Sequence, residues 1–286
     1  MGFANHVKTV VLLGLLTGLL LWIGSFFGAN GLTTALILAF VMNFASYFWS
    51  DKIVLWIYKA KEADQKEHAR LYKLVHEVVH AAGIPMPKVF ILPTEHSNAF
   101  ATGRNPTHAT LAFSMGILSL LNDTELKGVI AHEAAHVKNR DILIASVAAM
   151  IAGVISYLAA MARWAAIFGG FGGRDQDNGS NIFEFLVLAI LTPILATLIQ
   201  LAISRSREFH ADASGAKMLH SGVGLASALE KLEADIAKKP LKATSQIETT
   251  AHVMIANPFK GGALVRIFST HPPMQERIKR LRAMTF

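Results

Sequence analysis

The sequence contains no cysteine and few charged residues. The absence of cysteine excludes disulfides, thiolate nucleophiles, Cys-ligated zinc and iron–sulfur clusters, so any bound metal must rely on His and carboxylate side chains. Only 16% of the 286 residues are charged, compared with roughly 25% in an ordinary soluble domain. With 52% hydrophobic residues and a mean hydropathy of +0.41, the composition favours a membrane protein.

The N-terminal part of the chain has no charged residue between Lys8 and Asp51. A single helix of that length would be about twice as long as the hydrocarbon core of a bilayer is thick. Because Gly28–Gly31 is a turn-forming cluster, we expect a helical hairpin of about Val10–Phe27 and Leu32–Trp49. A cleaved signal peptide is the alternative, but the second apolar segment argues against it.

A second apolar pair predicts a second hairpin, from Ile142–Ala162 and Phe185–Ser204, joined by a glycine-rich polar loop. Alternatively, these two segments are core helices of a soluble domain, since they hold more small and polar residues than the first pair. The expected organisation is a first transmembrane hairpin, a hydrophilic part, a second transmembrane hairpin and another hydrophilic part, at 1–50, 51–141, 142–204 and 205–286.

The distribution of basic residues predicts the orientation in the membrane. Of the 27 Lys and Arg residues, 25 lie on the side that holds both hydrophilic parts and both termini. The positive-inside rule places that side in the cytoplasm. The net charge of +7 is explained by this bias, so we expect the lipid bilayer and no nucleic acid as a partner.

Two copies of the zinc-binding pattern H-E-x-x-H are present, at His76–His80 and at His132–His136. On a helix, two His residues four positions apart project from one face and can bind one Zn²⁺, and the adjacent Glu can accept a proton from water. The pattern is short enough to arise by chance. The helical faces on which the two copies lie distinguish them.

The first copy lies in an amphipathic helix, near Arg70–Ala82, with its two histidines opposite the apolar stripe and in water. The second copy lies in a helix that begins near Asn122–Thr124 and is apolar nearly all round, which predicts burial. Buried His132, Glu133 and His136 need a strong partner to compensate their desolvation, and a metal supplies one. The pattern therefore favours the second copy.

A third protein ligand is required, because two His residues leave zinc under-coordinated. Glu208 and Asp212 are four residues apart and share one helical face, so Glu208 can ligate the metal while Asp212 orients a ligand histidine. His210 is a competing ligand on a different face. Alternatively, the segment is a solvated charge run. Both clusters adjoin the second apolar pair, whose hairpin would bring them together at one end.

A small β-sheet is predicted between the two copies of the pattern. Val89–Leu92 is typical of a strand, and Asn98–Thr102 with His108–Phe113 is typical of a hairpin. An exposed edge there can accept an extended substrate as an added strand, or the hairpin can simply cover the core. Asn98 is accordingly a candidate for binding the substrate backbone or a plain turn residue.

Near the C-terminus, His271 can stabilise an oxyanion in catalysis or can simply belong to the turn before a helix at Met274–Met284. In that helix Ile278 and Leu281 are expected in the core. A solvated or lipid-headgroup-facing surface is expected from the basic residues Arg277, Lys279, Arg280 and Arg282.

The order of these motifs resembles the HtpX-like membrane zinc metallopeptidases, bacterial heat-shock proteases related to the CAAX prenyl-peptide endopeptidases. The resemblance covers nearly the whole chain. It is carried by the two apolar hairpins and by the motifs Asn98–Gly103, His132–His136, Glu208–Asp212 and Thr270–Pro272.

The resemblance implies a mainly α (α+β) fold, with four transmembrane helices in two hairpins and a cytoplasmic gluzincin-type domain with a small β-sheet. It implies that His132, His136 and Glu208 bind one Zn²⁺ per chain and that Glu133 is the catalytic base. The implied activity is endoproteolysis of misfolded or damaged membrane proteins from the cytoplasmic side of the bacterial inner membrane, in quality control and stress response.

The residues alone leave two other functions open. One is a membrane metal hydrolase that acts on a lipid or a prenylated non-protein substrate, for which the metal site would look the same. The other is a non-catalytic adaptor with a structural zinc. Glu133 argues against the adaptor, because structural zinc sites use protein ligands at all four positions.

Overall fold

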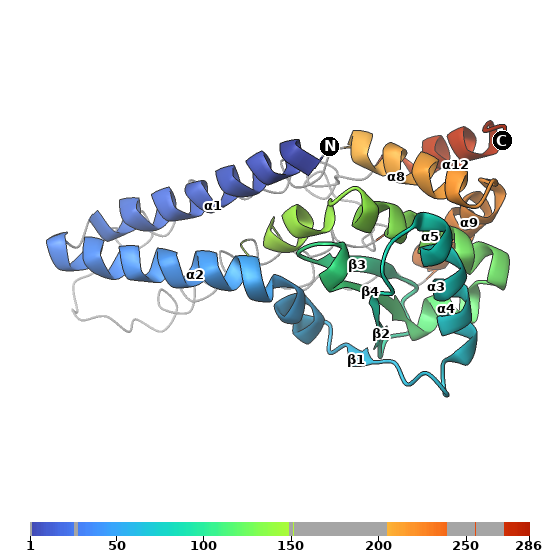
Figure 1. The fold of residues 1–286 in the computed structure, drawn as a ribbon, viewed down its shortest axis with the longest axis horizontal. Coiled ribbons are helices and arrows are strands. Elements are labelled where there is room, and N and C mark those ends of the chain that lie inside the picture. The colour runs from blue at the N-terminus through green and yellow to red at the C-terminus, as the bar shows by residue number, and fades with distance from the viewer. Residues whose placement is uncertain (1, 26–27, 149–150, 152–204, 239–254, 256–271) are drawn as a thin grey trace, which may run out of the picture.

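The computed structural model describes residues 2–25, 28–148, 151, 205–238, 255 and 272–286. A long helical hairpin projects from a compact part that holds one sheet and the remaining helices (Figure 1). Most of the second expected hairpin and His271 lie outside the described residues. Of that hairpin, residues 142–148 and 151 are described, and they are helical.

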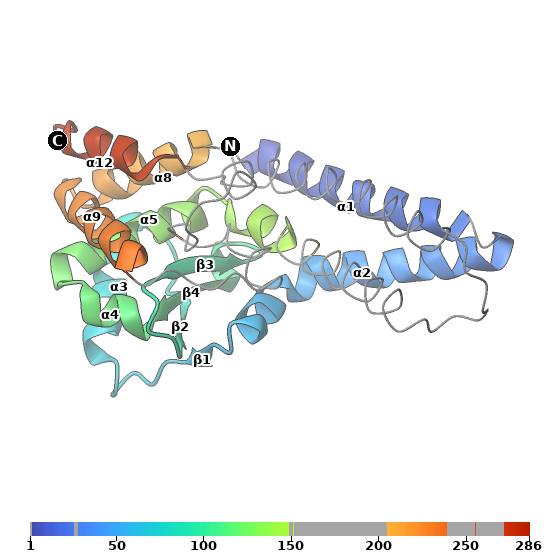
Figure 2. The same ribbon diagram turned by 180° about the vertical axis from the view of Figure 1, so that it is seen from behind.

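The projecting hairpin consists of α1 (Gly2–Ser25) and α2 (Gly28–Ile57), which lie side by side in both views (Figures 1 and 2). In its interior, Asn43 Nδ2 donates to Thr17 Oγ1 at 2.7 Å. By length and composition, α2 is the one described helix able to cross a membrane, and α1 contains a shorter apolar stretch, Val7–Trp22.

The second helix begins earlier and ends later than the sequence suggested. It starts at Gly28 rather than Leu32, because Gly28 itself adopts the positive φ of 69° that glycine tolerates, so the next three residues are free to be helical. Asp51 and Lys52 do not end it, since charged residues are compatible with a helix that has left the apolar layer. It continues to Ile57.

The sheet is small and mixed, with strand order β1-β2-β4-β3. Its strands are β1 (Lys61–Glu62), β2 (Lys88–Leu92), β3 (Ala99–Gly103) and β4 (Ala109–Ser114). β2 and β4 are parallel, and β3 and β4 form the expected antiparallel hairpin, with Ala99 opposite Phe113. β3 is therefore an edge strand of the described sheet, but all of its residues are buried, so its edge is not exposed as the sequence suggested. One reason is that Ile255 N donates to Ala99 O on that side.

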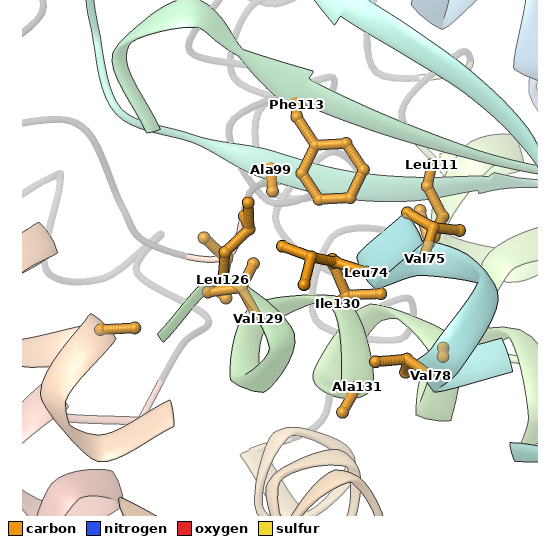
Figure 3. Packing of buried hydrophobic residues seen from close by; sticks show 14 of the residues in the cluster. Leu74, Val75, Val78, Ala99, Leu111, Phe113, Leu126, Val129, Ile130 and Ala131 are labelled. Atoms are coloured by element: carbon orange, nitrogen blue, oxygen red, sulfur yellow. The ribbon is translucent and has the colours of Figure 1, made fainter. Parts of the chain in front are cut away.

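Helices α3 (Ala69–Ala82), α4 (Met115–Leu120) and α5 (Asp123–Lys138) pack with this sheet. Leu74, Val75 and Val78 of α3 meet Leu126, Val129 and Ile130 of α5 beneath the strands (Figure 3). The expected division of α3 is confirmed, because its apolar stripe is buried whereas His76 and His80 are exposed. Burial of α5 nearly all round is confirmed as well.

The start of α5 is fixed by Asn122, the first of the three caps that the sequence allowed. Its side chain accepts from the backbone N–H of Glu125, and Glu125 accepts from the backbone N–H of Asn122 at 3.0 Å. This reciprocal capping box satisfies two N–H groups that a helix start leaves without partners. Lys231 Nζ and Ser227 Oγ also donate to Glu125, at 2.7 Å each.

Helices α8 (Arg205–Met218), α9 (Val223–Lys238) and α12 (Met274–Arg282) complete the compact part, and both α8 and α9 contact α5. Glycines allow these helices to approach closely. A Cβ on Gly215 of α8 would lie 3.0 Å from the backbone of Ala131 and His132. A Cβ on Gly128 of α5 would run into the backbone of Leu225 in α9.

The expectation for α12 needs one correction. Ile278 and Leu281 are buried as expected, but Arg277 is 0% exposed rather than part of a solvated or headgroup-facing surface. The reason is a partner 65 residues away in sequence, since the Arg277 guanidinium is paired with the Asp212 carboxylate of α8. A helical pattern by itself does not reveal such a partner.

Candidate metal centre

Three ligand atoms converge where α5 and α8 meet. His132 and His136 are one turn apart on α5, and their Nε2 atoms are 3.2 Å apart. Glu208, in the first turn of α8, places Oε2 3.7 Å from His132 Nε2 and Oε1 3.6 Å from His136 Nε2. Among the residues that the structure describes, this is the one cluster of His, Asp and Glu compact enough to hold a metal ion.

The geometry of this cluster fits zinc. Ligands that each lie about 2.0–2.1 Å from a tetrahedral ion are about 3.3 Å from one another. The three distances of 3.2, 3.6 and 3.7 Å are close to that value. Two imidazoles and one carboxylate also form a typical ligand set of catalytic zinc, which leaves the fourth position open.

Each ligand histidine has a carboxylate on its other ring nitrogen. His132 Nδ1 lies 2.9 Å from Asp212 Oδ1, and His136 Nδ1 lies 3.2 Å from Asp141 Oδ2. A carboxylate at Nδ1 holds the proton there and directs Nε2 toward the metal. Asp212 was anticipated from the sequence, whereas Asp141 was not.

Asp141 reaches His136 because of the way α5 ends. The backbone N–H of Asp141 donates to His136 O, and that of Arg140 donates to Val137 O. This is the Schellman arrangement, with Arg140 at a positive φ of 60° in the position that glycine usually occupies. The turn directs the chain back over the last turn of α5, and Asp141 thereby meets a ligand that lies five residues before it.

Glu133 lies between the metal cluster and the sheet. It is 3% exposed, and the backbone N–H of Ala101 in β3 donates to its carboxylate. Burial raises the pKa of Glu133 above its usual range, and Glu208 adds to this effect, while the neighbouring histidines and the Ala101 N–H oppose it. A carboxyl group with a raised pKa is suited to accept and return a proton near neutral pH.

Neighbouring charges also shift the pKa of His136. Burial alone would lower its pKa, but the hydrogen bond to Asp141 and the charges of Glu208, Glu133 and Asp141 raise the pKa to about 9. Without a metal, this imidazole is therefore a cation at pH 7. The Glu208 carboxylate lies beside both imidazoles, and a carboxylate with two imidazoles is a ligand set that binds zinc.

The edge strand β3 runs beside the cluster. The carbonyl of Asn98 accepts from Ser114 N, so the alternate residues Ala99 and Ala101 direct their backbone groups away from β4. On that side, Ala99 O accepts from Ile255 N at 3.1 Å. The buried Asn98 side chain accepts from Ala99 N at 2.9 Å.

Of the residues singled out in the sequence, the structure brings together His132, Glu133, His136, Glu208 and Asp212. The histidines of the other copy, His76 and His80, are solvent-exposed on α3 and take no part in this cluster. Two contributors were missed, Asp141 and Arg277. No sequence motif marks either residue. Asp141 reaches the site through the turn at Arg140, and Arg277 through its partner Asp212 in a distant helix.

A helix with H-E-x-x-H, a Glu from a second helix and an edge strand beside them are typical of a zinc metalloprotease. Comparison with known proteins agrees with this class. The sequence profile of peptidase family M48 matches residues 65–285. The Protease HtpX homolog of Desulfatibacillum aliphaticivorans is 52% identical over 278 residues, which cover 97% of this chain and 89% of that protein.

The Protease HtpX homolog of Syntrophotalea carbinolica is 51% identical over 282 residues, which cover 98% of this chain and 99% of that protein. A crystal structure of S. mikatae Ste24p matches 98% of this chain and 66% of that chain, with a TM-score of 0.49 and 19% identity. The chain therefore belongs to peptidase family M48 and is a membrane metalloprotease of the HtpX type.

Proposed function

We propose that the protein is a zinc-dependent endopeptidase of the bacterial inner membrane that cleaves misfolded or damaged membrane proteins from the cytoplasmic side. The observation that carries this proposal is the cluster of His132, His136 and Glu208, with Glu133 buried beside it. The apolar α1–α2 hairpin supports a position in the membrane. One zinc ion per chain is the cofactor.

When bound, zinc lowers the pKa of a water molecule to near neutrality and polarises the scissile carbonyl. Glu133 accepts the proton of that water and later passes it to the leaving amine. Its raised pKa and its burial favour both transfers, because the carboxylate is held away from bulk solvent. Asp212 and Asp141 keep the two ligand imidazoles turned toward the metal.

Substrate recognition is proposed at the edge of β3. Ala99 N, Ala99 O and Ala101 N already have partners on this side of β3. A peptide in extended conformation would therefore pair here by displacing the Ile255 contact, and recognition would depend on backbone rather than on side-chain identity. Such tolerance suits a protease of protein quality control. We assign Asn98 to the same edge as a contact for the substrate backbone, and His271 to stabilisation of the oxyanion.

The test compares purified wild-type protein with Glu133→Gln, in detergent, on casein and on an unfolded membrane protein. Because Glu133 is not a ligand, the variant should retain one zinc per chain by metal analysis, yet lose at least about 10³-fold in turnover. A chelator should abolish cleavage by the wild type, and added zinc should restore it.

The matched control is Glu77→Gln, which makes the same change in the other H-E-x-x-H copy, where Glu77 forms a surface ion pair with Lys127. This variant should cleave like the wild type. Unchanged proteolysis by Glu133→Gln, with contaminating protease excluded, would contradict the assignment. Release of a lipid or prenyl product with no peptide cleavage would replace the substrate class.

A further inference from the structure

Arg277 in α12 is the only Lys or Arg side chain that is fully buried among the described residues. Burying a cation is costly unless it is paired and hydrogen-bonded. Arg277 meets that condition, because Nε donates to Asp212 Oδ2 at 2.9 Å and Nη2 donates to Asp212 Oδ1 at 2.7 Å. This is a bidentate pair, which fixes the plane of the carboxylate as well as its position.

The pair is continuous with the metal cluster. Asp212 Oδ1, which accepts from Arg277, is also the atom that lies 2.9 Å from His132 Nδ1. Arg277 Nη1 lies 3.8 Å from Glu208 Oε2, so the same guanidinium also faces the carboxylate ligand. One side chain of α12 therefore neighbours two of the three proposed zinc ligands.

Arg277 Nη2 also lies 3.5 Å from each ring nitrogen of His132. A further contact of Arg277 leads to the edge strand. Arg277 Nη1 donates to Ile255 O at 3.1 Å, and Ile255 N donates to Ala99 O in β3. The guanidinium is thus held on one side by a carboxylate and on the other by a backbone carbonyl. Its position is determined by α8, by β3 through Ile255, and by its own helix.

We propose that Arg277 is a positioning residue of the metal centre. It holds the Asp212 carboxylate in the orientation that accepts a hydrogen bond from His132 Nδ1. The inference rests on the zinc site proposed above. Arg277 does not touch the metal or the substrate in this role. It acts through Asp212, because the bidentate pair prevents the carboxylate from rotating away from His132.

Electrostatics support this geometry. Burial alone would raise the pKa of Asp212, but the charge and hydrogen bonds of Arg277, with a contribution from His132, lower the pKa to about 2. The bidentate pair also leaves Asp212 Oδ1 directed at His132 Nδ1. The His132 proton then stays on Nδ1, and Nε2 remains free to bind the metal.

The experiment measures the zinc affinity of full-length Arg277→Lys and Arg277→Gln by competition with a chelator, together with the absorption spectrum of the cobalt-substituted protein. Loss of an outer partner of a ligand histidine typically lowers metal affinity by about 10–100-fold. Both variants should show this loss, an altered cobalt spectrum and a reduced kcat at a similar KM. A lysine does not rescue, because it cannot form the bidentate pair.

The matched control is Arg282→Gln in the same helix, where Arg282 forms an exposed ion pair with Glu230. It should bind zinc like the wild type. Asp212→Asn should lower the affinity, and adding Arg277→Lys to it should have little further effect, since both changes break one interaction. If the loss of zinc affinity in the double variant equals the sum of the free-energy losses in the two single variants, the proposal is overturned.

If the single variants do not fold, the double variant Arg277→Met with Asp212→Leu replaces the buried pair by apolar side chains, an exchange that folded proteins often tolerate. Its zinc affinity should still fall about 10–100-fold. Wild-type affinity and an unchanged cobalt spectrum in a folded Arg277 variant would overturn the positioning role. Absence of zinc binding by the wild type itself would instead overturn the proposed function.

Discussion

At the scale of single residues, the metal cluster consists of three ligands held by a second set of charged side chains. Asp141 and Asp212 each face a ligand histidine, and Arg277 pairs with Asp212. This set orients the two imidazoles and raises the pKa of His136, and so affects how readily the site takes up a metal. Its effect can be measured without any substrate.

We expect zinc binding to be strongly pH-dependent. The pKa of His136 in the metal-free protein is raised to about 9, and zinc binds the neutral imidazole, so uptake below that pH releases a proton. The apparent dissociation constant for zinc should fall roughly tenfold per pH unit as the pH rises toward about 9, and then level off. Chelator competition at constant ionic strength measures this profile.

Asp141→Asn provides the control for that profile. It removes the charged acceptor that raises the pKa of His136, so the levelling should move to lower pH even though the variant binds zinc more weakly overall. A zinc affinity that is independent of pH between about 6.5 and 9 would contradict the assignment of His136 as a ligand that is protonated in the metal-free state.

The residue scale also marks the limit of sequence reasoning. His132, Glu133 and His136 follow from spacing on one helix, because a helix of known period fixes which side chains share a face. The role of Arg277 does not follow from spacing. Its neighbours Lys279, Arg280 and Arg282 are also basic, and the partner with which it is buried lies in α8. Only the tertiary contact distinguishes this one arginine from the others.

At the scale of elements, α5 is the central helix of the compact part. It contacts α3, α8, α9 and the edge strand β3. Small residues on α5 allow α9 to approach closely, at the contact of Gly128 with the backbone of Leu225. Since the ligands are on α5 and α8, the packing of α5 determines whether they meet.

Gly128→Ala should destabilise the protein. The added Cβ has no room against the Leu225 backbone, and overpacking costs about 1–3 kcal/mol, which exceeds the roughly 1 kcal/mol that alanine contributes to helix formation over glycine. The melting temperature in detergent should fall.

Gly18→Ala in α1 is the matched control, because nothing lies within 4 Å of the position of its added Cβ. Its melting temperature should be unchanged or slightly higher. An increase in stability for Gly128→Ala would mean that α9 can move away from α5 at little cost, contrary to the close contact described here.

Elements with strong local signals were predicted well. The stripe of α3, its end at Ala82 and the β3–β4 hairpin all follow from side-chain periodicity and turn residues, which act within a few positions. The ends of α2 were predicted less well, because four consecutive turn-forming residues do not show which one takes the positive φ. The turn that directs Asp141 toward His136 was missed, since an arginine occupies the position where glycine is expected.

At the scale of the whole molecule, the apolar hairpin and the compact part form an elongated shape (Figure 2). The distribution of Lys and Arg predicts that the compact part is cytoplasmic and that the loop between the second apolar pair is on the opposite side. This orientation can be tested by cysteine labelling. Because the chain has no cysteine of its own, a thiol reagent would label only a single introduced cysteine.

We expect a membrane-impermeant maleimide to label Ser180→Cys in intact cells with a permeabilised outer membrane. His80→Cys, on the exposed face of α3, should be labelled only after the inner membrane is disrupted. Both variants should keep wild-type proteolysis, which shows that the labelled protein is folded. Labelling of His80→Cys in intact cells would contradict the predicted orientation and would place the compact part outside the cytoplasm.

The wide spacing of the metal-centre residues along the chain has a consequence for biosynthesis. His132 and Arg277 are 145 positions apart in the sequence, and the segment between them includes Glu208 and the second apolar pair. A nascent chain still emerging from the ribosome contains His132 and His136 long before it contains Arg277. If Arg277 positions the metal centre as proposed, the zinc site can be completed only late in translation, after the ribosome has synthesised both apolar pairs.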